Sequence, residues 1–206
     1  MIKIGVCGSS GSGKGFVCKL FSTYGYKWID TDRVYRDLAT PKSDCVKELR
    51  ECFGDSILNP DGSLNRKSLS KIVFEGEGSR QRLNQLNKIT HFHIEKETVK
   101  LINESEQNGY KGVLIDAPVL FESGFDKMCD VTICVTAPTE LKLQRIMSRD
   151  GITYEKALSR ISSQLTDNDL REKCAYEIDN SANADVEKQI LDIIAELRNK
   201  FKNKNN

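Results

Sequence analysis

Residues 8–15 read Gly8-Ser9-Ser10-Gly11-Ser12-Gly13-Lys14-Gly15, and this stretch decides the fold. It follows a short apolar run over residues 2–7 and precedes a helical pattern that starts near Lys14. A glycine-rich loop between a strand and a helix is typical of phosphate-binding sites, because glycines let several backbone N–H groups point into one concavity. We therefore expect a nucleotide to bind here, with Lys14 reaching its β- and γ-phosphates. The residues expected to bind ATP in this loop are Ser10, Gly11, Ser12, Gly13, Lys14 and Gly15.

The position after the lysine departs from the usual motif. Phosphate-binding loops ordinarily carry Ser or Thr there, and the hydroxyl of that residue is a ligand of Mg²⁺. This chain has Gly15 instead, which carries no side chain. The alternative interpretation is a glycine-rich turn without a ligand. The lysine and the strand–loop–helix context favour the nucleotide site.

Length, charge and cysteine content exclude several classes of protein. The 206 residues suit one globular domain, and 31 basic against 30 acidic residues leave a net charge of +1. This balance argues against a general nucleic-acid binder or a membrane-surface protein. No stretch approaches the roughly 18 apolar residues of a membrane span, and the N-terminus leads into a strand rather than a signal peptide. The seven cysteines form no CxxC pair, which indicates reduced thiols in a cytoplasmic protein rather than a metal cluster. The sequence does not indicate an oligomeric state.

The order of apolar runs and helical patterns predicts an α/β fold. Strands are expected at residues 2–7, 26–29, 112–116, 130–135 and 176–178, with helical patterns at about 14–23, from Arg33, at 138–149 and at 185–201. Strands that alternate with helices predict a parallel sheet covered on both faces, which is the three-layer architecture of P-loop NTPases. Ligands of such a sheet gather at the carboxyl ends of its strands.

Two segments stand apart from this alternation within a domain expected to cover 1–206. Residues of about 43–108 are mostly helical and are expected to form a helical insertion on the substrate side, by analogy with other P-loop folds. Residues of about 149–173 are charged and helical, which fits either a lid that closes over the nucleotide or an ordinary exposed helix pair. The polar tail at 200–206 is expected to fray.

Three carboxylates are expected at strand ends, beside the phosphate loop. Asp30 and Asp32 follow the second strand, and Asp116 ends the third. Phosphoryl transfer to an alcohol needs a carboxylate that accepts the hydroxyl proton, and Asp32 is the best candidate for this general base. Aspartate is also favoured at helix N-termini, so helix capping remains an equal alternative for Asp30 and Asp32.

Basic and aromatic residues offer weaker signals. Arg145 and Arg149 lie four residues apart and share one helix face, where they would grip phosphates or simply face solvent. His91 and His93 are two residues apart, so a shared metal site on a helix is not expected, and structural roles are commoner for such histidines. Phe121 belongs either to the core or to the wall of a pocket.

Taken in order along the chain, these segments resemble the dephospho-CoA kinase family. The matching segments are residues 8–14, Asp30-Thr31-Asp32, Ile89-Thr90-His91, the run Asp116-Ala117-Pro118-Val119-Leu120-Phe121-Glu122, residues 145–150, residues 160–164 and Ile178-Asp179-Asn180-Ser181. The resemblance spans residues 2 to about 198. The phosphate loop alone would indicate only a nucleotide, whereas the ordered set is far more specific.

The resemblance implies ATP-dependent phosphorylation of the ribose 3′-hydroxyl of dephospho-CoA, the last step of coenzyme A synthesis. Asp32 matches the family's catalytic aspartate, Lys14 would bridge the β- and γ-phosphates, and Arg145 would stabilise the moving phosphoryl group. Arg149 and the lid would close over ATP, with Mg²⁺ as cofactor. The segments expected to hold the acceptor contain Asp30, His91, Asp116, Pro118 and Phe121.

Two departures from the family pattern bear on these expectations. Gly15 removes the hydroxyl that normally meets Mg²⁺, so we expect water, phosphate oxygens and Asp32 to complete the metal's ligands and the affinity for Mg²⁺ to be weak. Phe92 stands where the family has proline after the histidine, which affects the acceptor contacts expected of His91. The rival hypotheses are a P-loop kinase acting on a nucleoside, a nucleoside monophosphate or shikimate, and a nucleotide-binding module without turnover. A GTPase is disfavoured because the chain lacks a recognisable Asn-Lys-x-Asp segment.

Overall fold

The computed structural model describes residues 1–202 of the chain and divides them into two compact units. The first, here called the sheet unit, comprises Met1–Ile29 and the chain from Glu104 onward. The second, the helical unit, comprises Asp30–Asn103. Of the tail expected to fray, residues 203–206 lie outside the described part of the chain, and the helix before them extends to Lys202.

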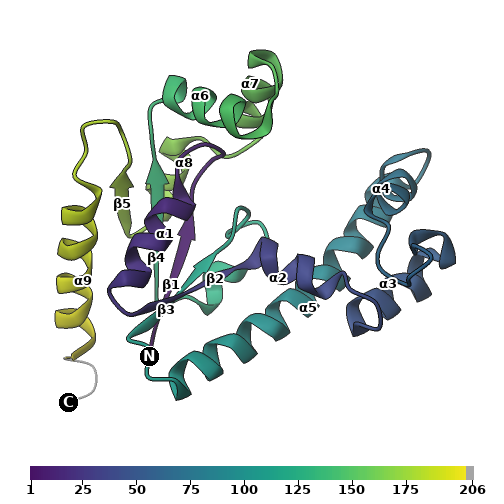
Figure 1. Cartoon of the computed structure of the whole chain (residues 1–206), viewed down its shortest axis with the longest axis horizontal. Coiled ribbons are helices and arrows are strands. Elements are labelled where there is room, and N and C mark those ends of the chain that lie inside the picture. The colour runs from purple at the N-terminus through teal and green to yellow at the C-terminus, as the bar shows by residue number, and fades with distance from the viewer. Residues whose placement is uncertain (203–206) are drawn as a thin grey trace. The chain divides into compact units, whose positions relative to one another are not determined.

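The sheet unit is built on a five-stranded sheet of order β2-β3-β1-β4-β5 (Figure 1). Its strands are β1 (Ile2–Cys7), β2 (Tyr26–Asp30), β3 (Gly112–Asp116), β4 (Val131–Thr136) and β5 (Tyr176–Asp179). The central strand β1 pairs in parallel with β3 and β4, and β4 pairs in parallel with β5. The expected parallel α/β sheet is confirmed, with strand bounds within one residue of those predicted.

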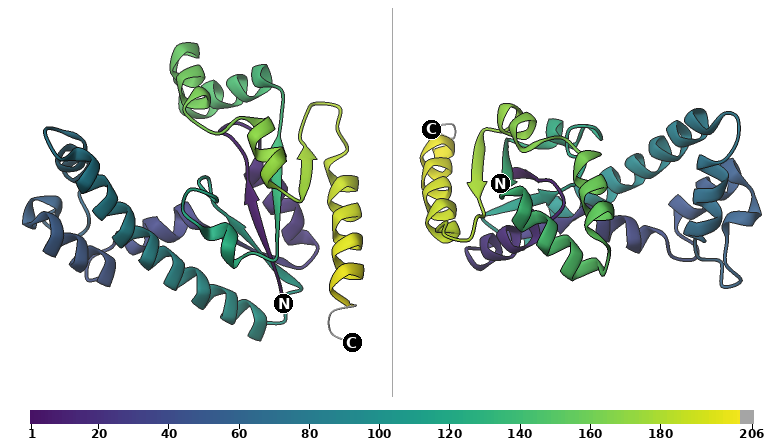
Figure 2. Two further views of the ribbon diagram at one scale, coloured as in Figure 1. Left: turned by 180° about the vertical axis from the view of Figure 1, so that it is seen from behind. Right: turned by 90° about the horizontal axis from the view of Figure 1, so that it is seen from above.

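Helices α1 (Lys14–Thr23) and α9 (Val186–Lys202) cover one face of this sheet. Figures 1 and 2 show α9 running beside β5 at the edge of the unit. Alternate strand residues such as Ile4 and Val6 are fully buried against Phe21 of α1 and Ile190 of α9. This alternation follows from the two-residue period of a strand, which sends neighbouring side chains to opposite faces.

The other face of the sheet is covered by the segment that follows β3 and by α8 (Asp167–Lys173), which packs against β4. The segment contains the short helix η2 (Phe125–Met128). A Cβ placed on Gly5 would lie 2.9 Å from the Cys129 sulfur and 3.0 Å from the Leu120 side chain, so the segment approaches the backbone of β1 closely. Apolar strands covered on both faces are what a parallel sheet requires.

The charged segment expected to be a lid forms separate helices. Helix α6 (Thr139–Asp150) packs against α7 (Tyr154–Ser162) through Ile146 and Ala157, and α8 follows. Residues 163–166, inside the segment of about 149–173 expected to be helical, form the turn between α7 and α8. The break has a local cause, because Thr166 and Asp169 form a reciprocal capping box that starts α8 anew.

The helical unit contains the helix expected from Arg33 and the helices of the insertion expected at about 43–108. They are α2 (Thr31–Leu38), α3 (Asp44–Phe53), η1 (Asp55–Ile57), α4 (Arg66–Phe74) and the long α5 (Ser79–Gln107), whose last residues belong to the sheet unit. Side-chain caps start several of them: Ser43 caps α3 and Asn65 caps α4. The unit has its own core, centred on the fully buried Leu49, Ile57 and Val73.

No helix among the described residues combines the length and the apolar character that crossing a membrane requires.

Candidate active site

The loop between β1 and α1 has the backbone conformation that its glycines predict. Gly11 and Gly13 have φ values of +80° and +87°, in the left-handed region that other residues avoid. A Cβ on Gly11 would lie 2.5 Å from the Lys142 carbonyl oxygen, and one on Gly13 would lie 2.0 Å from Asn180 Nδ2. Neighbouring backbone and side chains therefore approach the loop so closely that only glycine fits at these two positions.

Two residues far along the chain hold the loop in this shape. Asn180, which follows β5, donates from Nδ2 to the Ser12 carbonyl at 2.7 Å and is 6% exposed. Arg145, on α6, donates from Nη1 to the carbonyls of Gly11 and Ser12, both at 3.2 Å, and from Nη2 to the Asn180 carbonyl at 3.1 Å. Because these two side chains bind carbonyls of the loop, they do not compete with an anion for its N–H groups.

The loop also contains a buried polar atom without a hydrogen-bond partner among the described residues. Ser12 is 1% exposed, and its Oγ has no hydrogen-bond partner among residues 1–202. A buried hydroxyl without a partner costs about 1–3 kcal/mol, so such groups commonly mark a ligand site. Another donor of the loop, the Ser10 N–H, is bonded to Gln164 Oε1 at 2.8 Å.

At the end of the loop, Lys14 meets a carboxylate. Its ammonium forms an ion pair with Oδ1 of Asp116, the last residue of β3. The indole N–H of Trp28, on β2, donates to the other oxygen of Asp116 at 3.0 Å. Asp116 is 4% exposed, and these two donors compensate for burying its charge. The prediction that the loop and Asp116 meet at one edge of the sheet is confirmed.

A second buried ion pair links the loop to α8. Lys142 on α6 is 4% exposed and donates to both oxygens of Asp167, at 2.9 and 3.0 Å. The Ser9 hydroxyl lies between them, accepting from Lys142 at 3.1 Å and donating to Asp167 at 3.2 Å. Together with the bond from Ser10 to Gln164, this network fixes the turn before α8 and the start of α8 against the phosphate loop.

A cavity of about 680 Å³ opens beside the loop within the sheet unit. It is lined by Gly13 of the loop, by Phe16 and Leu20 of α1, and by Arg145, Asn180 and Asp185. Phe16 is 56% exposed, so an aromatic face is available at the wall. A cavity with apolar walls, a guanidinium group and main-chain groups suits the base and sugar of a nucleotide.

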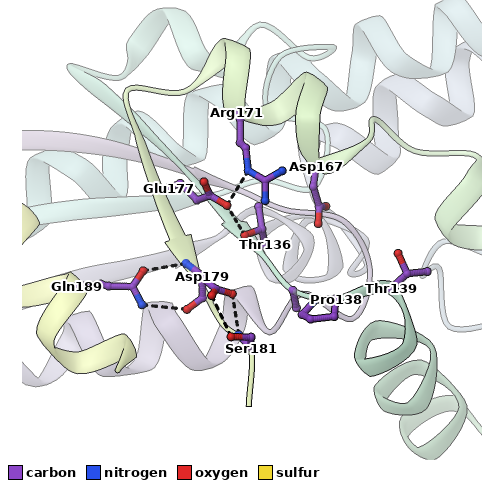
Figure 3. A pocket seen from close by; sticks show the side chains of 10 residues that line it. Thr136, Pro138, Thr139, Asp167, Arg171, Glu177, Asp179, Ser181 and Gln189 are labelled. Atoms are coloured by element: carbon purple, nitrogen blue, oxygen red, sulfur yellow. Dashed lines mark hydrogen bonds and ion pairs between the residues drawn. The ribbon is translucent and has the colours of Figure 1, made fainter. Parts of the chain in front are cut away.

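A second cavity, of about 690 Å³, lies at the carboxyl ends of β4 and β5 (Figure 3). Its polar groups pair with one another: Glu177 Oε1 accepts from Arg171 Nε at 2.8 Å and from the Thr136 hydroxyl at 2.6 Å. Asp179 accepts from both the N–H and the hydroxyl of Ser181, which also lines the first cavity. These internal bonds make the second cavity a poorer ligand site than the first.

The remaining predicted residues of the sheet unit have mixed surroundings. Arg149 binds Asp150 at 2.7 and 2.9 Å and is mostly exposed, as expected for a solvated helix face. The two arginines of α6 therefore differ, because Arg145 contacts the loop. Pro118 is exposed and lines a small cavity beside Gly8 and Ser9. Phe121 is half-buried, with the Lys173 ammonium 5.5 Å from its ring centre.

The predicted residues of the helical unit lie on α2 and α5. Asp30 accepts from the Arg33 N–H at 3.1 Å, so the capping interpretation holds for Asp30, and α2 begins at Thr31 rather than at Arg33. Asp32 lies in the first turn of α2, is exposed and is not the cap.

The two histidines of α5 have different surroundings. Partial burial lowers the pKa of His91. His93 is buried and bonds Glu48 at 2.8 Å, which is a structural contact.

Sequence reasoning missed several residues that shape the loop: Trp28, Lys142, Gln164 and Asn180. Asn180 lies in the Ile178-Asp179-Asn180-Ser181 segment, so its place after a strand end was a usable signal. Lys142 and Trp28 gave no such signal, because their partners are distant in the sequence. Lys142 lies 133 residues from Ser9, and Trp28 lies 88 residues from Asp116.

Comparisons with known proteins agree with this geometry. A family model described as dephospho-CoA kinase matches residues 2–185. A protein of Dehalococcoides mccartyi named dephospho-CoA kinase is 36% identical over 195 residues, which is 95% of this chain and 96% of that protein. One of Corynebacterium glutamicum with the same name is 36% identical over 199 residues, covering 96% and 98% of the two chains.

Solved structures share the fold of this chain. The crystal structure of TT1252 from Thermus thermophilus has a TM-score of 0.78 and 27% identity, covering 95% of this chain and 97% of that one. A dephospho-CoA kinase from Campylobacter jejuni has a TM-score of 0.66 at 24% identity, covering 95% and 96%, which supports the fold alone. The resemblance inferred from the motifs is confirmed, and the chain belongs to the dephospho-CoA kinase family.

Proposed function

We propose that this protein is a dephospho-CoA kinase that uses ATP. It transfers the γ-phosphoryl group of ATP to the ribose 3′-hydroxyl of dephospho-CoA and yields coenzyme A and ADP, the last step of coenzyme A biosynthesis. The observation that carries the proposal is the phosphate loop braced by Arg145 and Asn180, with Lys14 beside the buried Asp116, in a chain of this family. The enzyme class is an ATP-dependent phosphotransferase with an alcohol as acceptor.

ATP would bind along the loop. The N–H groups of Ser10 and Ser12 bind Gln164 and the Ser9 carbonyl, so the other N–H groups of the loop and the N-terminus of α1 would bind the phosphates. The buried Ser12 hydroxyl would supply a further donor. Lys14 would exchange part of its contact with Asp116 for the β- and γ-phosphates. The base and sugar would lie in the 680 Å³ cavity beside Gly13 and Phe16. Arg149, whose ion pair with Asp150 is exposed, would leave that partner and bind ATP when the lid closes.

The chemical step needs one proton acceptor and stabilisation of charge. The acceptor's 3′-oxygen forms a bond to the γ-phosphorus while the bond from that phosphorus to the β–γ bridging oxygen breaks, and ADP leaves with the electron pair. We assign the proton of the 3′-hydroxyl to the carboxylate of Asp32, which is exposed at the start of α2. Arg145 and Lys14 would stabilise the charge on the moving phosphoryl group.

We propose that Asp30, His91, Asp116, Pro118 and Phe121 hold dephospho-CoA. The lowered pKa of His91 keeps its ring neutral at pH 7, so it would act as a hydrogen-bonding group rather than as a cation. Phe121 offers a half-exposed ring for an apolar part of the acceptor. Phe92, which is 57% exposed, replaces the family's proline beside His91, so the contacts of this segment would be particular to this chain.

We propose Mg²⁺ as the metal cofactor, and the residues present fit it. Mg²⁺ prefers carboxylate, phosphate and water oxygens, and Asp116 places a carboxylate beside the loop lysine. Asp32, through water, and phosphate oxygens would be its ligands, with the Asp116 carboxylate beside the loop lysine. When bound, Mg²⁺ neutralises charge on the β- and γ-phosphates. Because Gly15 supplies no hydroxyl, we expect weak affinity for the metal.

The partners would be the two small-molecule substrates alone, with no nucleic acid or membrane. We propose a cytoplasmic location, supported by free cysteines at all seven positions.

An acceptor panel tests the proposal against its nearest rival. ADP release is measured with ATP and Mg²⁺ in the presence of dephospho-CoA, a nucleoside, a nucleoside monophosphate or shikimate. We expect release only with dephospho-CoA. Release with a nucleoside monophosphate and none with dephospho-CoA would assign the protein to another P-loop kinase activity. Absence of release with every acceptor, alongside intact ATP binding, would favour a binding module without turnover.

A further inference from the structure

The chain's single tryptophan lies over the position where the phosphate loop lacks a side chain. A Cβ placed on Gly15 would be 3.7 and 3.8 Å from atoms Cη2 and Cζ2 of the Trp28 ring, which is ordinary van der Waals contact. The indole ring therefore occupies the space next to the one a serine or threonine would enter. Trp28 lies on β2, is half-buried and packs against the core that α1 and α9 form with the sheet.

The polar end of the same ring is bound to Asp116. The Nε1–H of Trp28 donates to Oδ2 at 3.0 Å, while Lys14 is paired with Oδ1. Each oxygen of the carboxylate thus has its own donor, and the plane of the carboxylate is fixed between β2 and the loop. Asp116 is 4% exposed, so losing one donor would leave a largely buried carboxylate oxygen without this support.

We propose that Trp28 is a positioning residue that compensates for the missing hydroxyl at position 15. By holding Oδ2, its N–H orients the Asp116 carboxylate towards Lys14 and the metal-bearing end of the triphosphate. Gly15 and Trp28 then act together. Gly15 leaves the loop without a side chain at this position, and the Trp28 N–H fixes the Asp116 carboxylate, which must act at the phosphates without help from a hydroxyl. This inference rests on the proposed use of ATP with Mg²⁺, but not on the identity of the acceptor.

The simpler alternative is that Trp28 merely fills space at the sheet edge. The two interpretations differ in what the N–H does. Packing would survive replacement by phenylalanine, which keeps an aromatic ring, whereas positioning of Asp116 would not. They also differ in whether a hydroxyl restored at position 15 can relieve the loss.

The experiment measures how strongly Mg²⁺ improves ATP binding. ATP affinity is determined by calorimetry with and without Mg²⁺ for the wild type, Trp28→Phe, Gly15→Ser and the double variant. We expect Trp28→Phe to reduce the factor by which Mg²⁺ improves ATP affinity about tenfold, because the variant loses a hydrogen bond to a charged group. In the Gly15→Ser background, the same replacement should cost less than about twofold. Tyr176→Phe is the matched control, because it removes an aromatic donor from the Glu196 carboxylate, and neither residue lines the cavity beside the loop.

A second readout needs no variant. Trp28 is the only tryptophan, so the intrinsic fluorescence of the unmodified protein reports on this contact. We expect its emission to shift when Mg²⁺ is added to the ATP-saturated protein.

Each outcome bears on a distinct claim. Three results would overturn the role of Trp28. The first is a folded Trp28→Phe protein whose coupling between Mg²⁺ and ATP matches that of the wild type. The others are equal losses with and without the Gly15→Ser replacement, and an emission spectrum that does not change when Mg²⁺ is added. If Trp28→Phe does not fold, the fluorescence measurement decides. A wild-type protein that shows the coupling but makes no coenzyme A would overturn the proposed acceptor and leave the role of Trp28 standing.

Discussion

Replacing Gly13 by alanine should damage the phosphate loop by two separable effects. Gly13 has φ +87° and ψ +21°, and an L-residue in this left-handed conformation costs about 1–2 kcal/mol. The new Cβ would also lie 2.0 Å from Asn180 Nδ2, so the Asn180 side chain must move. Moving it breaks the 2.7 Å bond to the Ser12 carbonyl, which keeps its bond from Arg145, and leaving the buried Asn180 amide without this acceptor costs about 1–3 kcal/mol. We expect Gly13→Ala to lower the free energy of unfolding by about 2–5 kcal/mol.

Gly124→Ala is the matched control for this prediction. Gly124 also belongs to the sheet unit and has φ +78° and ψ +10°, but a Cβ there would meet nothing within 4 Å. This variant should show the conformational cost alone, about 1–2 kcal/mol. Urea unfolding of both variants gives the difference, and calorimetry gives their affinity for ATP. Only Gly13→Ala should also weaken ATP binding, because only it displaces the residue that braces the loop.

Equal destabilisation by the two replacements would refute this reasoning, since the contact with Asn180 would then contribute nothing. Unchanged ATP affinity in a destabilised Gly13→Ala protein would refute the link between the brace and phosphate binding.

Two further predictions concern the proposed base and the lid. Asp32→Asn should leave ATP binding nearly intact and reduce turnover by roughly 10²–10⁴-fold, which is the range for loss of a general base. Single-turnover kinetics that match the wild type would show that Asp32 is not the base. The bonds of Asp150 to Arg149 and Arg160 lower the pKa of its carboxyl from 3.8 to about 2. The stability that these ion pairs give the corner between α6 and α7 is therefore present above about pH 3.8 and is lost as the pH falls through about 2. An NMR titration should show that low value in the wild type and a value nearer 3.8 in Arg149→Gln, whereas a wild-type midpoint near 3.8 would contradict the ion pair.

Local sequence signals predicted the scaffold well. Each of the main signals is contained in a few neighbouring residues: the glycines of the loop, the apolar strands and the carboxylates at the strand ends. The parallel sheet and the contact of Lys14 with Asp116 were therefore predictable. The start of α2 was missed by two residues, because aspartate is favoured at helix N-termini and the sequence did not decide whether Asp30 or Asp32 is the cap. The sequence pattern did not place the break between α7 and α8, which the capping box at the start of α8 sets.

The contacts that shape the loop were not predictable, because they join distant parts of the chain. Arg145 and Asn180 bind loop carbonyls across more than 130 residues, and nothing near either residue specifies a carbonyl partner. Trp28 is a similar case: a tryptophan in a strand suggests core packing, and only the folded sheet brings its N–H to Asp116. The catalytic and acceptor roles of Asp32 and His91 stay predictions.

The central claim is that this loop holds ATP for transfer to one specific hydroxyl, and the product identifies that hydroxyl most directly. Purified protein is incubated with ATP, Mg²⁺ and dephospho-CoA, and the products are resolved by mass and by phosphorus NMR. The account predicts coenzyme A carrying its new phosphate on the ribose 3′-oxygen, formed in equal amount with ADP, and no such product from Lys14→Ala. A phosphate at another position, or ADP formed from wild-type protein without any coenzyme A, would contradict it.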